Sequence, residues 1–182
     1  MNYVLLFILT PGFLLSFNAF GGEIAASIKA PLEKLGALAE KADESTLSKQ
    51  LTIFSDYLAK NQEKVTDVMQ HPEALQAVVD FHSCLETRLD LLKDEGKELK
   101  KRNRWKGRLH TVTYSKKRIS AEKYEEATAS INSHLQKHNG RLAELTKQKA
   151  ENWKVCETFY KTAMQKSAVS KAGQSQSPAN DR

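Results

Sequence analysis

The feature that most constrains this sequence is the way its apolar residues pair when the chain folds back on itself at Ser120. Long segments with helical spacing of apolar residues flank Ser120 on both sides. In an antiparallel hairpin centred there, residues whose numbers add to about 240 lie at the same level, and one such pair is Cys84 with Cys156, the two cysteines of the chain. Other pairs are Leu85 with Val155, Leu99 with Leu142, Trp105 with Leu135, and Leu109 with Ile131. The sequence therefore predicts a helical hairpin that brings both sulfur atoms together.

Local signals around Ser120 indicate one helix ending and another beginning. Ser120 is a good N-cap residue, because its hydroxyl can accept a hydrogen bond from a free backbone N–H. Ile119 and Tyr124 have the spacing of a hydrophobic staple. Cations at 116–118 precede the cap and glutamates at 122, 125 and 126 follow it, as the helix dipole favours at the two helix ends.

A turn near residue 113 is the alternative. Gly107 can end a helix, and the β-branched and aromatic residues Thr111–Tyr114 suit an extended loop. This turn would put the two cysteines fourteen residues out of level, which is ~21 Å along a helix axis. A disulfide needs Cα atoms within about 7 Å, so in this alternative the cysteines would be buried free thiols.

The composition favours a fold made only of helices, since the chain has four prolines and eight glycines in 182 residues. We expect an all-α, elongated bundle of three to four helices with a long antiparallel two-helix coiled-coil hairpin arm. A first helix should begin near Pro31, and a second should run over 46–70. A third should begin at Pro72 and a fourth should run over 121–166, with the arm formed by residues 97–143.

The two ends of the chain predict export and a tail. Residues 1–21 have an apolar run without charge and small residues at Ala19 and Gly21, which is typical of a signal peptide. They contain no Lys or Arg, and an uncleaved N-terminal anchor is the alternative. Residues 22–166 should form a single helical domain, and residues 167–182, rich in Ser, Gln and Ala, a disordered tail. Two cysteines in an exported chain favour a disulfide, so we expect a periplasmic or secreted protein.

Positive charge concentrates on the predicted arm. Residues 97–143 hold thirteen Lys and Arg and four Glu, a net charge of +9, whereas the whole chain is +6, which leaves −3 for the rest. Such asymmetry suggests an anionic partner for the arm. The candidate partner-binding residues are Lys97, Lys100, Lys101, Arg102, Arg104, Lys106, Arg108, Lys116, Lys117 and Arg118. A plainly solvated surface is the alternative, because a helix that buries one stripe must be polar elsewhere.

Other residue types that could carry chemistry are isolated. His134 and His138 are one turn apart, but a third metal ligand is absent nearby and the predicted hairpin register places Lys106 and Arg102 opposite them. His82 and Cys84 are two apart on a helix and would not face each other, so a hydrogen-bonded structural histidine is expected. We predict no catalytic residue, no cofactor and no metal site, and therefore no enzyme.

The expected function is binding. No motif identifies a family, but the layout of an exported helical hairpin with a basic arm resembles that of periplasmic holdase chaperones and of secretion-pilus subunits, in architecture alone. We expect a non-enzymatic binding or scaffold protein whose arm docks an acidic protein partner. Nucleic acid, an anionic membrane surface and self-association through the regular apolar spacing of 75–99 are the alternatives.

Overall fold

The computed structural model describes residues 21–61 and 72–169. Its helices are α1 (Gly21–Ala39), α2 (Glu44–Lys60), α4 (Pro72–Tyr114), the short 3-10 helix η2 (Lys116–Arg118) and α5 (Ala121–Val169), and this part of the chain contains no strand. The all-α prediction is confirmed. The predicted signal peptide, apart from Gly21, lies outside the described residues, and so does the predicted tail from residue 170 on.

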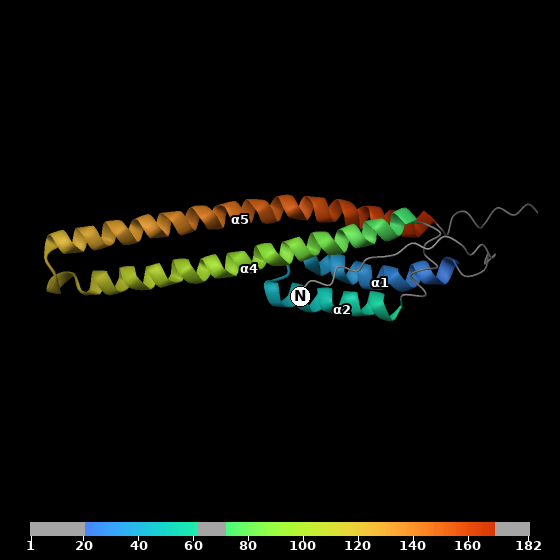
Figure 1. Cartoon of the computed structure of the whole chain (residues 1–182), viewed down its shortest axis with the longest axis horizontal. Helices are drawn as coiled ribbons and strands as arrows, with labels where there is room; N and C mark the ends of the chain where they lie inside the picture. The colour runs from blue at the N-terminus through green and yellow to red at the C-terminus, as the bar shows by residue number, and fades with distance from the viewer. Residues whose placement is uncertain (1–20, 62–71, 170–182) are drawn as a thin grey trace, which may run out of the picture.

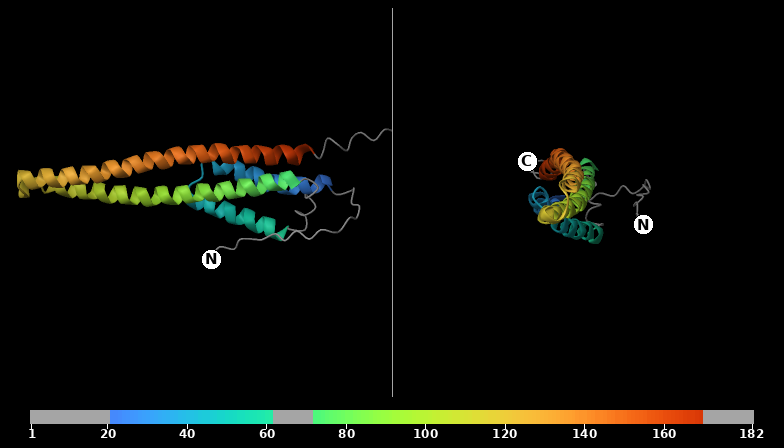
Figure 2. Two further views of the ribbon diagram at one scale, coloured as in Figure 1. Left: turned by 45° about the horizontal axis from the view of Figure 1, so that its top comes forward. Right: turned by 90° about the vertical axis from the view of Figure 1, so that its left-hand side faces the viewer.

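Two long helices form the body of the molecule. Helices α4 and α5 run antiparallel along each other, and α1 and α2 lie against one half of this hairpin (Figure 1). The left view of Figure 2 shows the other half projecting as two helices alone. We call the four-helix part the base and residues 97–143 the arm. The boundary falls where α2 begins. Gly96 on α4 lies beside Glu44, the first residue of α2, since a Cβ atom at Gly96 would lie 3.6 Å from Oε2 of Glu44.

The turn at the end of the arm follows the prediction at Ser120. Its hydroxyl accepts a hydrogen bond from the N–H of Lys123 at 3.4 Å, and its carbonyl accepts one from the N–H of Tyr124 at 3.0 Å. Between Tyr114 and Ser120 the chain makes η2, with the N–H of Arg118 bonded to the carbonyl of Ser115. Ser120 therefore caps α5 as expected.

The alternative turn near residue 113 is wrong. Helix α4 continues through Gly107 to Tyr114. The hydroxyls of Thr111 and Thr113 donate to the carbonyls of Gly107 and Leu109, at 3.1 and 2.8 Å. This local bonding to the preceding turn is the usual way in which a β-branched polar residue is accommodated in a helix.

The register predicted from the cysteines is confirmed. Cys84 on α4 and Cys156 on α5 form a disulfide with their Cα atoms 5.5 Å apart. The link joins residues separated by 72 positions and lies within the base. It therefore ties together the two helices that run on into the arm.

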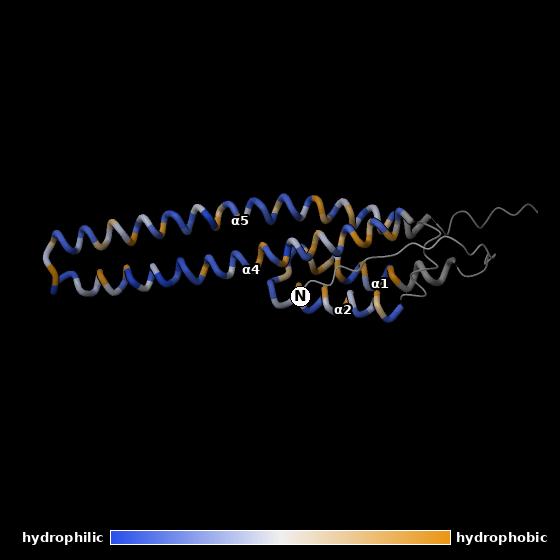
Figure 3. The backbone as a smooth tube through the Cα atoms, viewed as in Figure 1, coloured by the Kyte–Doolittle hydropathy of each residue, from blue (hydrophilic) through white to orange (hydrophobic). Residues whose placement is uncertain are grey.

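The hydrophobic core lies in the base. Its most buried large side chains are Leu32, Leu47, Phe81, Leu85 and Cys156, from all four helices. Figure 3 shows hydrophobic positions gathered where the four helices meet and mostly hydrophilic ones along the arm. In the arm, Ile131 is the large apolar side chain that is buried among the described residues.

Helix α4 has a second buried stripe that the apolar spacing did not predict. The predicted stripe includes His82 and Leu85, and His82 does face α2, where its ring lies 6.2 Å from that of Phe54. The second stripe carries Phe81, whose ring lies 5.4 Å from that of Tyr160 on α5. A helix covered by neighbours on several sides needs more than one apolar stripe, which a search for a single stripe overlooks.

The predicted start of the first helix needs correction. Pro31 lies inside α1 and not in its first turn, since α1 already begins at Gly21. Asp43 caps α2, with its Oδ1 accepting from the N–H of Thr46 at 2.7 Å. At the other end, α2 ends at Lys60, and the N–H and the side-chain amide of Asn61 both donate to the carbonyl of Tyr57. The rest of the predicted second helix, 62–70, lies outside the described residues.

Candidate functional site

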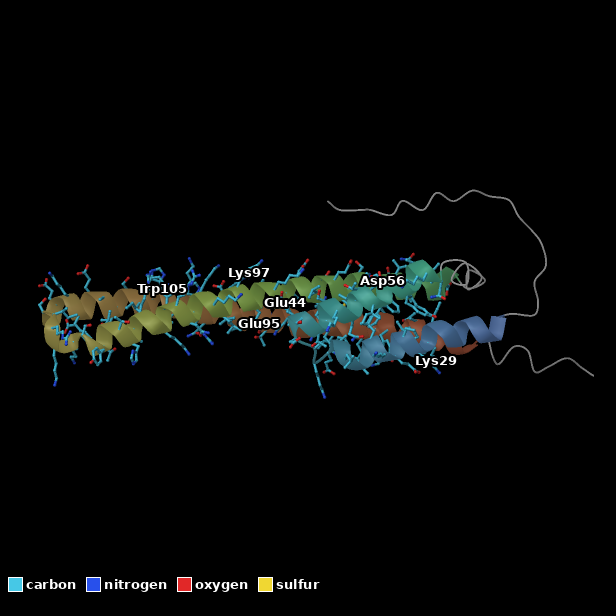
Figure 4. All side chains as sticks on the ribbon, turned by 90° about the horizontal axis from the view of Figure 1, so that it is seen from below. Lys29, Glu44, Asp56, Glu95, Lys97 and Trp105 are labelled. Atoms are coloured by element: carbon cyan, nitrogen blue, oxygen red, sulfur yellow. A yellow bond between two sulfur atoms is a disulfide. The ribbon has the colours of Figure 1, made fainter. Side chains whose placement is uncertain are left out.

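The ten predicted partner-binding cations lie on one helix of the hairpin and at its tip. Those from Lys97 to Arg108 lie on α4, and Lys116, Lys117 and Arg118 form η2. All are exposed except Arg102, which is half-buried. Figure 4 shows side chains radiating from this part of α4, with Lys97 and Trp105 beyond the ends of α1 and α2. The structure therefore places the predicted cations around the projecting part of α4 and at the tip of the arm.

Two of these cations are neutralised by neighbours on the same helix. Lys97 lies 2.9 Å from Asp94, and this hydrogen bond raises the pKa of Lys97 and lowers that of Asp94. Lys101 lies 3.2 Å from Glu98. Within residues 21–61 and 72–169, the other eight form no ion pair. The eight are Lys100, Arg102, Arg104, Lys106, Arg108, Lys116, Lys117 and Arg118.

An aromatic cluster organises the middle of the arm. The ring of Trp105 stacks on that of His134, with centroids 3.9 Å apart and an angle of 7° between the planes. The guanidinium carbon of Arg108 lies 4.4 Å from the centre of the Trp105 ring, within cation–π distance. The hairpin pairing placed Leu135 level with Trp105, and it did not predict this ring contact with the adjacent His134.

A shallow groove lies beside this cluster. Helix α4 lines it with Arg104, Trp105, Gly107, Arg108, Thr111 and Val112, and α5 lines it with Ala127, Ser130 and Ile131. The apolar part of the lining is Val112, Ala127 and Ile131, of which Ile131 is only 5% exposed. The space beside Gly107 is open, because a Cβ atom there would meet nothing within 4 Å.

A histidine–carboxylate pair joins the two helices near the root of the arm. Nδ1 of His138 on α5 lies 2.5 Å from Oε1 of Glu98 on α4, and both side chains are largely buried. The hydrogen bond from His138 lowers the pKa of Glu98. Arg102 was predicted to lie opposite His138, and the hydrogen-bond partner of His138 is Glu98, one turn nearer the base than Arg102.

The two arm histidines have separate partners, His134 on Trp105 and His138 on Glu98. Across the described part of the chain, no group of three or more His, Cys, Asp or Glu side chains is placed to hold a metal ion. His82 shares a hydrogen bond of 2.8 Å with the hydroxyl of Ser55. Because the sulfur of Cys84 is in the disulfide, it is not available as a nucleophile for His82 to activate.

The residue that sequence reasoning missed is Arg88 in the base. Its guanidinium donates to the carbonyls of Ala39 at 2.9 Å, Glu40 at 2.6 Å and Lys149 at 3.0 Å, and the side chain is buried. Burial lowers the pKa of Arg88. The only signal was its position, one turn after Cys84 and two after Phe81 on the second stripe of α4.

Arg88 explains how α1 is held on the hairpin. The carbonyls at the C-terminal end of a helix lack partners within the helix and carry partial negative charge. Arg88 satisfies two of them at the end of α1 and a third on α5. It also lies 5.4 Å from the centre of the Trp153 ring. One side chain of α4 therefore joins α1 and α5.

Within the described ranges, no helix is sufficiently long and apolar to cross a membrane. Together, the fold and the arm define the chain as an all-α hairpin bundle with a cationic projection. No protein-family model, no curated protein and no solved structure matches the sequence.

Proposed function

We propose that the chain is an exported, non-enzymatic binding or scaffold protein whose basic arm docks an acidic partner protein. The observation that carries the proposal is that eight of the ten predicted partner-binding cations have no ion-pair partner among the described residues. The disulfide supports export, because such bonds persist in oxidising compartments. An envelope chaperone or a component of a secretion system would use an arm of this kind.

The spacing of the cations supports binding over a merely solvated surface. Lys100, Arg104 and Arg108 follow one another at intervals of one helical turn. Like charges at this spacing destabilise a helix by about 0.2–0.5 kcal/mol per pair, whereas alternating charges would stabilise it. A surface selected only for solubility gains nothing from this arrangement. An acidic partner would remove the repulsion and convert it into binding free energy.

The aromatic cluster favours a protein over single-stranded nucleic acid. Proteins that bind single strands stack bases on open aromatic faces. The ring of His134 already covers a face of Trp105 at 3.9 Å, and Arg108 lies over the same ring at 4.4 Å. The apolar lining of the groove suits an aliphatic side chain better than a phosphate backbone.

The test is fluorescence anisotropy of labelled poly-glutamate with the full chain over a series of salt concentrations. We expect binding that weakens as salt rises, and a loss of at least tenfold in affinity when Arg102, Arg104, Lys106 and Arg108 are all changed to Gln. The matched control changes four exposed lysines of the base to Gln, namely Lys34, Lys41, Lys49 and Lys60. Equal losses in both variants, or no binding by the unchanged chain, would contradict the proposal.

The same titration separates the alternatives. Tighter binding of a DNA duplex than of poly-glutamate, with the affinity falling steeply with salt, would identify a nucleic-acid-binding protein. Co-sedimentation with vesicles containing phosphatidylglycerol, without binding to poly-glutamate, would identify a membrane-surface protein.

A further inference from the structure

The groove beside Trp105 differs from the rest of the arm, because it combines an apolar lining with two cations. Arg104 and Arg108 lie one turn apart on α4 and both line it. Ile131 supplies its buried wall from α5, with 5% exposure. The tip is also cationic, but its large apolar residues Tyr114 and Ile119 are exposed, and Lys116 there lies 5.0 Å from the centre of the half-buried Tyr124 ring. The groove differs in setting two arginines beside aliphatic side chains.

The aromatic cluster limits the movement of one arginine of the groove. A guanidinium 4.4 Å from the centre of the Trp105 ring gains cation–π attraction, and Trp105 itself is stacked on His134. An arginine held in this way loses less conformational entropy when it binds a carboxylate than a free surface lysine does. Arginine also presents two parallel N–H groups that match the two oxygens of a carboxylate.

We propose that this groove is the recognition site of the arm, and that it takes an acidic peptide segment with an aliphatic side chain between its carboxylates. The aliphatic side chain packs on the apolar lining of the groove, Val112 and Ala127, in the open space beside Gly107, and the carboxylates pair with Arg104 and Arg108. The inference rests on the proposed function and deepens it, since it adds a defined site to the general attraction of the arm for acidic proteins. It makes binding depend on shape as well as charge.

The chain offers a matched pair of substitutions that separates shape from charge. Gly107 and Gly140 are both exposed, both within helices of the arm, and a Cβ atom at either meets nothing within 4 Å. Gly107→Leu fills the groove and Gly140→Leu does not, although both leave the charge unchanged. Both replace a helical glycine with a strong helix former, so both variants should fold at least as well as the unchanged chain.

The experiment measures the affinity of two labelled peptides for the full chain by anisotropy. Both peptides are glutamate-rich with the same charge, and one has a central Leu where the other has Ser. We expect the unchanged chain and Gly140→Leu to bind the Leu peptide about five- to tenfold more tightly than the Ser peptide. Gly107→Leu should lose this preference while keeping its affinity for the Ser peptide.

Charge variants complete the design. The double variant Arg104→Gln with Arg108→Gln should bind the Leu peptide at least tenfold more weakly. The double variant Lys116→Gln with Lys117→Gln removes the same charge at the tip and should lower this affinity at most threefold. Equal affinity of the unchanged chain for both peptides, or an equal loss of affinity in the two double variants, would overturn the assignment of the groove as the recognition site. Either result would leave the proposed function standing. No binding of either peptide would overturn both proposals.

Self-association is the other outcome of the test, because the base is acidic and could occupy the groove of a second copy. Analytical ultracentrifugation of the unchanged chain at low salt distinguishes the two occupants. We expect a monomer in the absence of peptide. A dimer that is lost in Gly107→Leu and kept in Gly140→Leu would make a second copy the occupant and overturn the assignment to an acidic peptide.

Discussion

Helices α4 and α5 run through both the base and the arm, but their surroundings differ in the two regions. In the base, α4 and α5 are covered by α1 and α2, joined by the disulfide and bridged by Arg88. In the arm, the same helices have only each other, with one large buried apolar residue, Ile131, among those described. Arginine shows the contrast best: Arg88 has three carbonyl partners, while Nε of Arg102 is buried without a partner in the described part of the chain.

This contrast indicates that stability and binding depend on different regions of one continuous hairpin. Burial of apolar area and satisfied polar groups provide the free energy of folding in the base. The arm has less of both and carries unpaired positive charge, which speaks to association and not to the fold. Changes in the base should therefore alter stability, and changes in the arm should alter binding.

The largest expected effect comes from the disulfide. Replacing Cys84 and Cys156 with Ala should lower the free energy of unfolding by about 4 kcal/mol, because the link closes a long loop and restricts the unfolded chain. Urea titration followed by circular dichroism measures this. The affinity for poly-glutamate, measured where the variant is folded, should stay unchanged. A parallel loss of that affinity would show that the two regions are not separate.

Next in size is Arg88. Arg88→Met should cost about 3 kcal/mol, because three carbonyls at the junction of α1, α4 and α5 lose their donor. The arm control is Arg102→Met, which should change the free energy of unfolding by less than about 0.5 kcal/mol. Denaturant titration of both variants gives the comparison. Similar losses would mean that the arm contributes to stability as the base does.

Glycines in the two regions should respond with opposite signs. A Cβ atom at Gly36 in the base would lie 2.5 Å from Cε2 of Tyr160, whose ring is backed by Phe81, so Gly36→Ala should destabilise by about 2 kcal/mol. In the arm, Gly107→Ala and Gly140→Ala meet open space and should each stabilise by up to about 1 kcal/mol. Thermal unfolding of the three variants decides the signs, and a stabilising Gly36→Ala would contradict the close contact.

The smallest effect concerns the pH dependence of the arm. The pKa of Glu98 is lowered in the folded chain, chiefly by its hydrogen bond with His138, from an ordinary value of 4.5. Its contribution to stability is therefore complete above pH 4.5 and is lost as the pH falls through the lower folded value. Glu98→Gln should lose less stability than the unchanged chain over this range. Glu126→Gln, an exposed control, should follow the unchanged chain.

Much of the fold followed from the sequence, because the relevant signals were local or came in pairs. The cap at Ser120 and the level of Cys84 with Cys156 together gave the hairpin register, which the structure confirms. The position of Arg88 in the core did not follow, since an arginine among apolar residues usually indicates a solvent-exposed position. Its partners are backbone carbonyls at the end of α1 and on α5, and no side-chain pattern reveals them.

The candidate site was predictable in charge and not in shape. The cations were visible as a cluster from Lys97 to Arg118. The groove depends on which faces of α4 and α5 meet, and a rotation of either helix by one residue changes its lining. The stack of Trp105 on His134 shows this, because the hairpin pairing placed Leu135 level with Trp105 and did not predict the contact with the adjacent His134. Pairing by residue number gives the level of two residues and not the faces that meet.

Native-state hydrogen exchange, with and without reductant, tests the separation of base and arm most directly. With the disulfide intact, amides of the base around Phe81 and Leu85 should exchange far more slowly than those of the arm around Gly107 and Ile131. Reduction should speed exchange in the base by hundreds-fold or more and leave the arm nearly unchanged. Equal protection in both regions, or an arm that opens together with the base on reduction, would contradict the account.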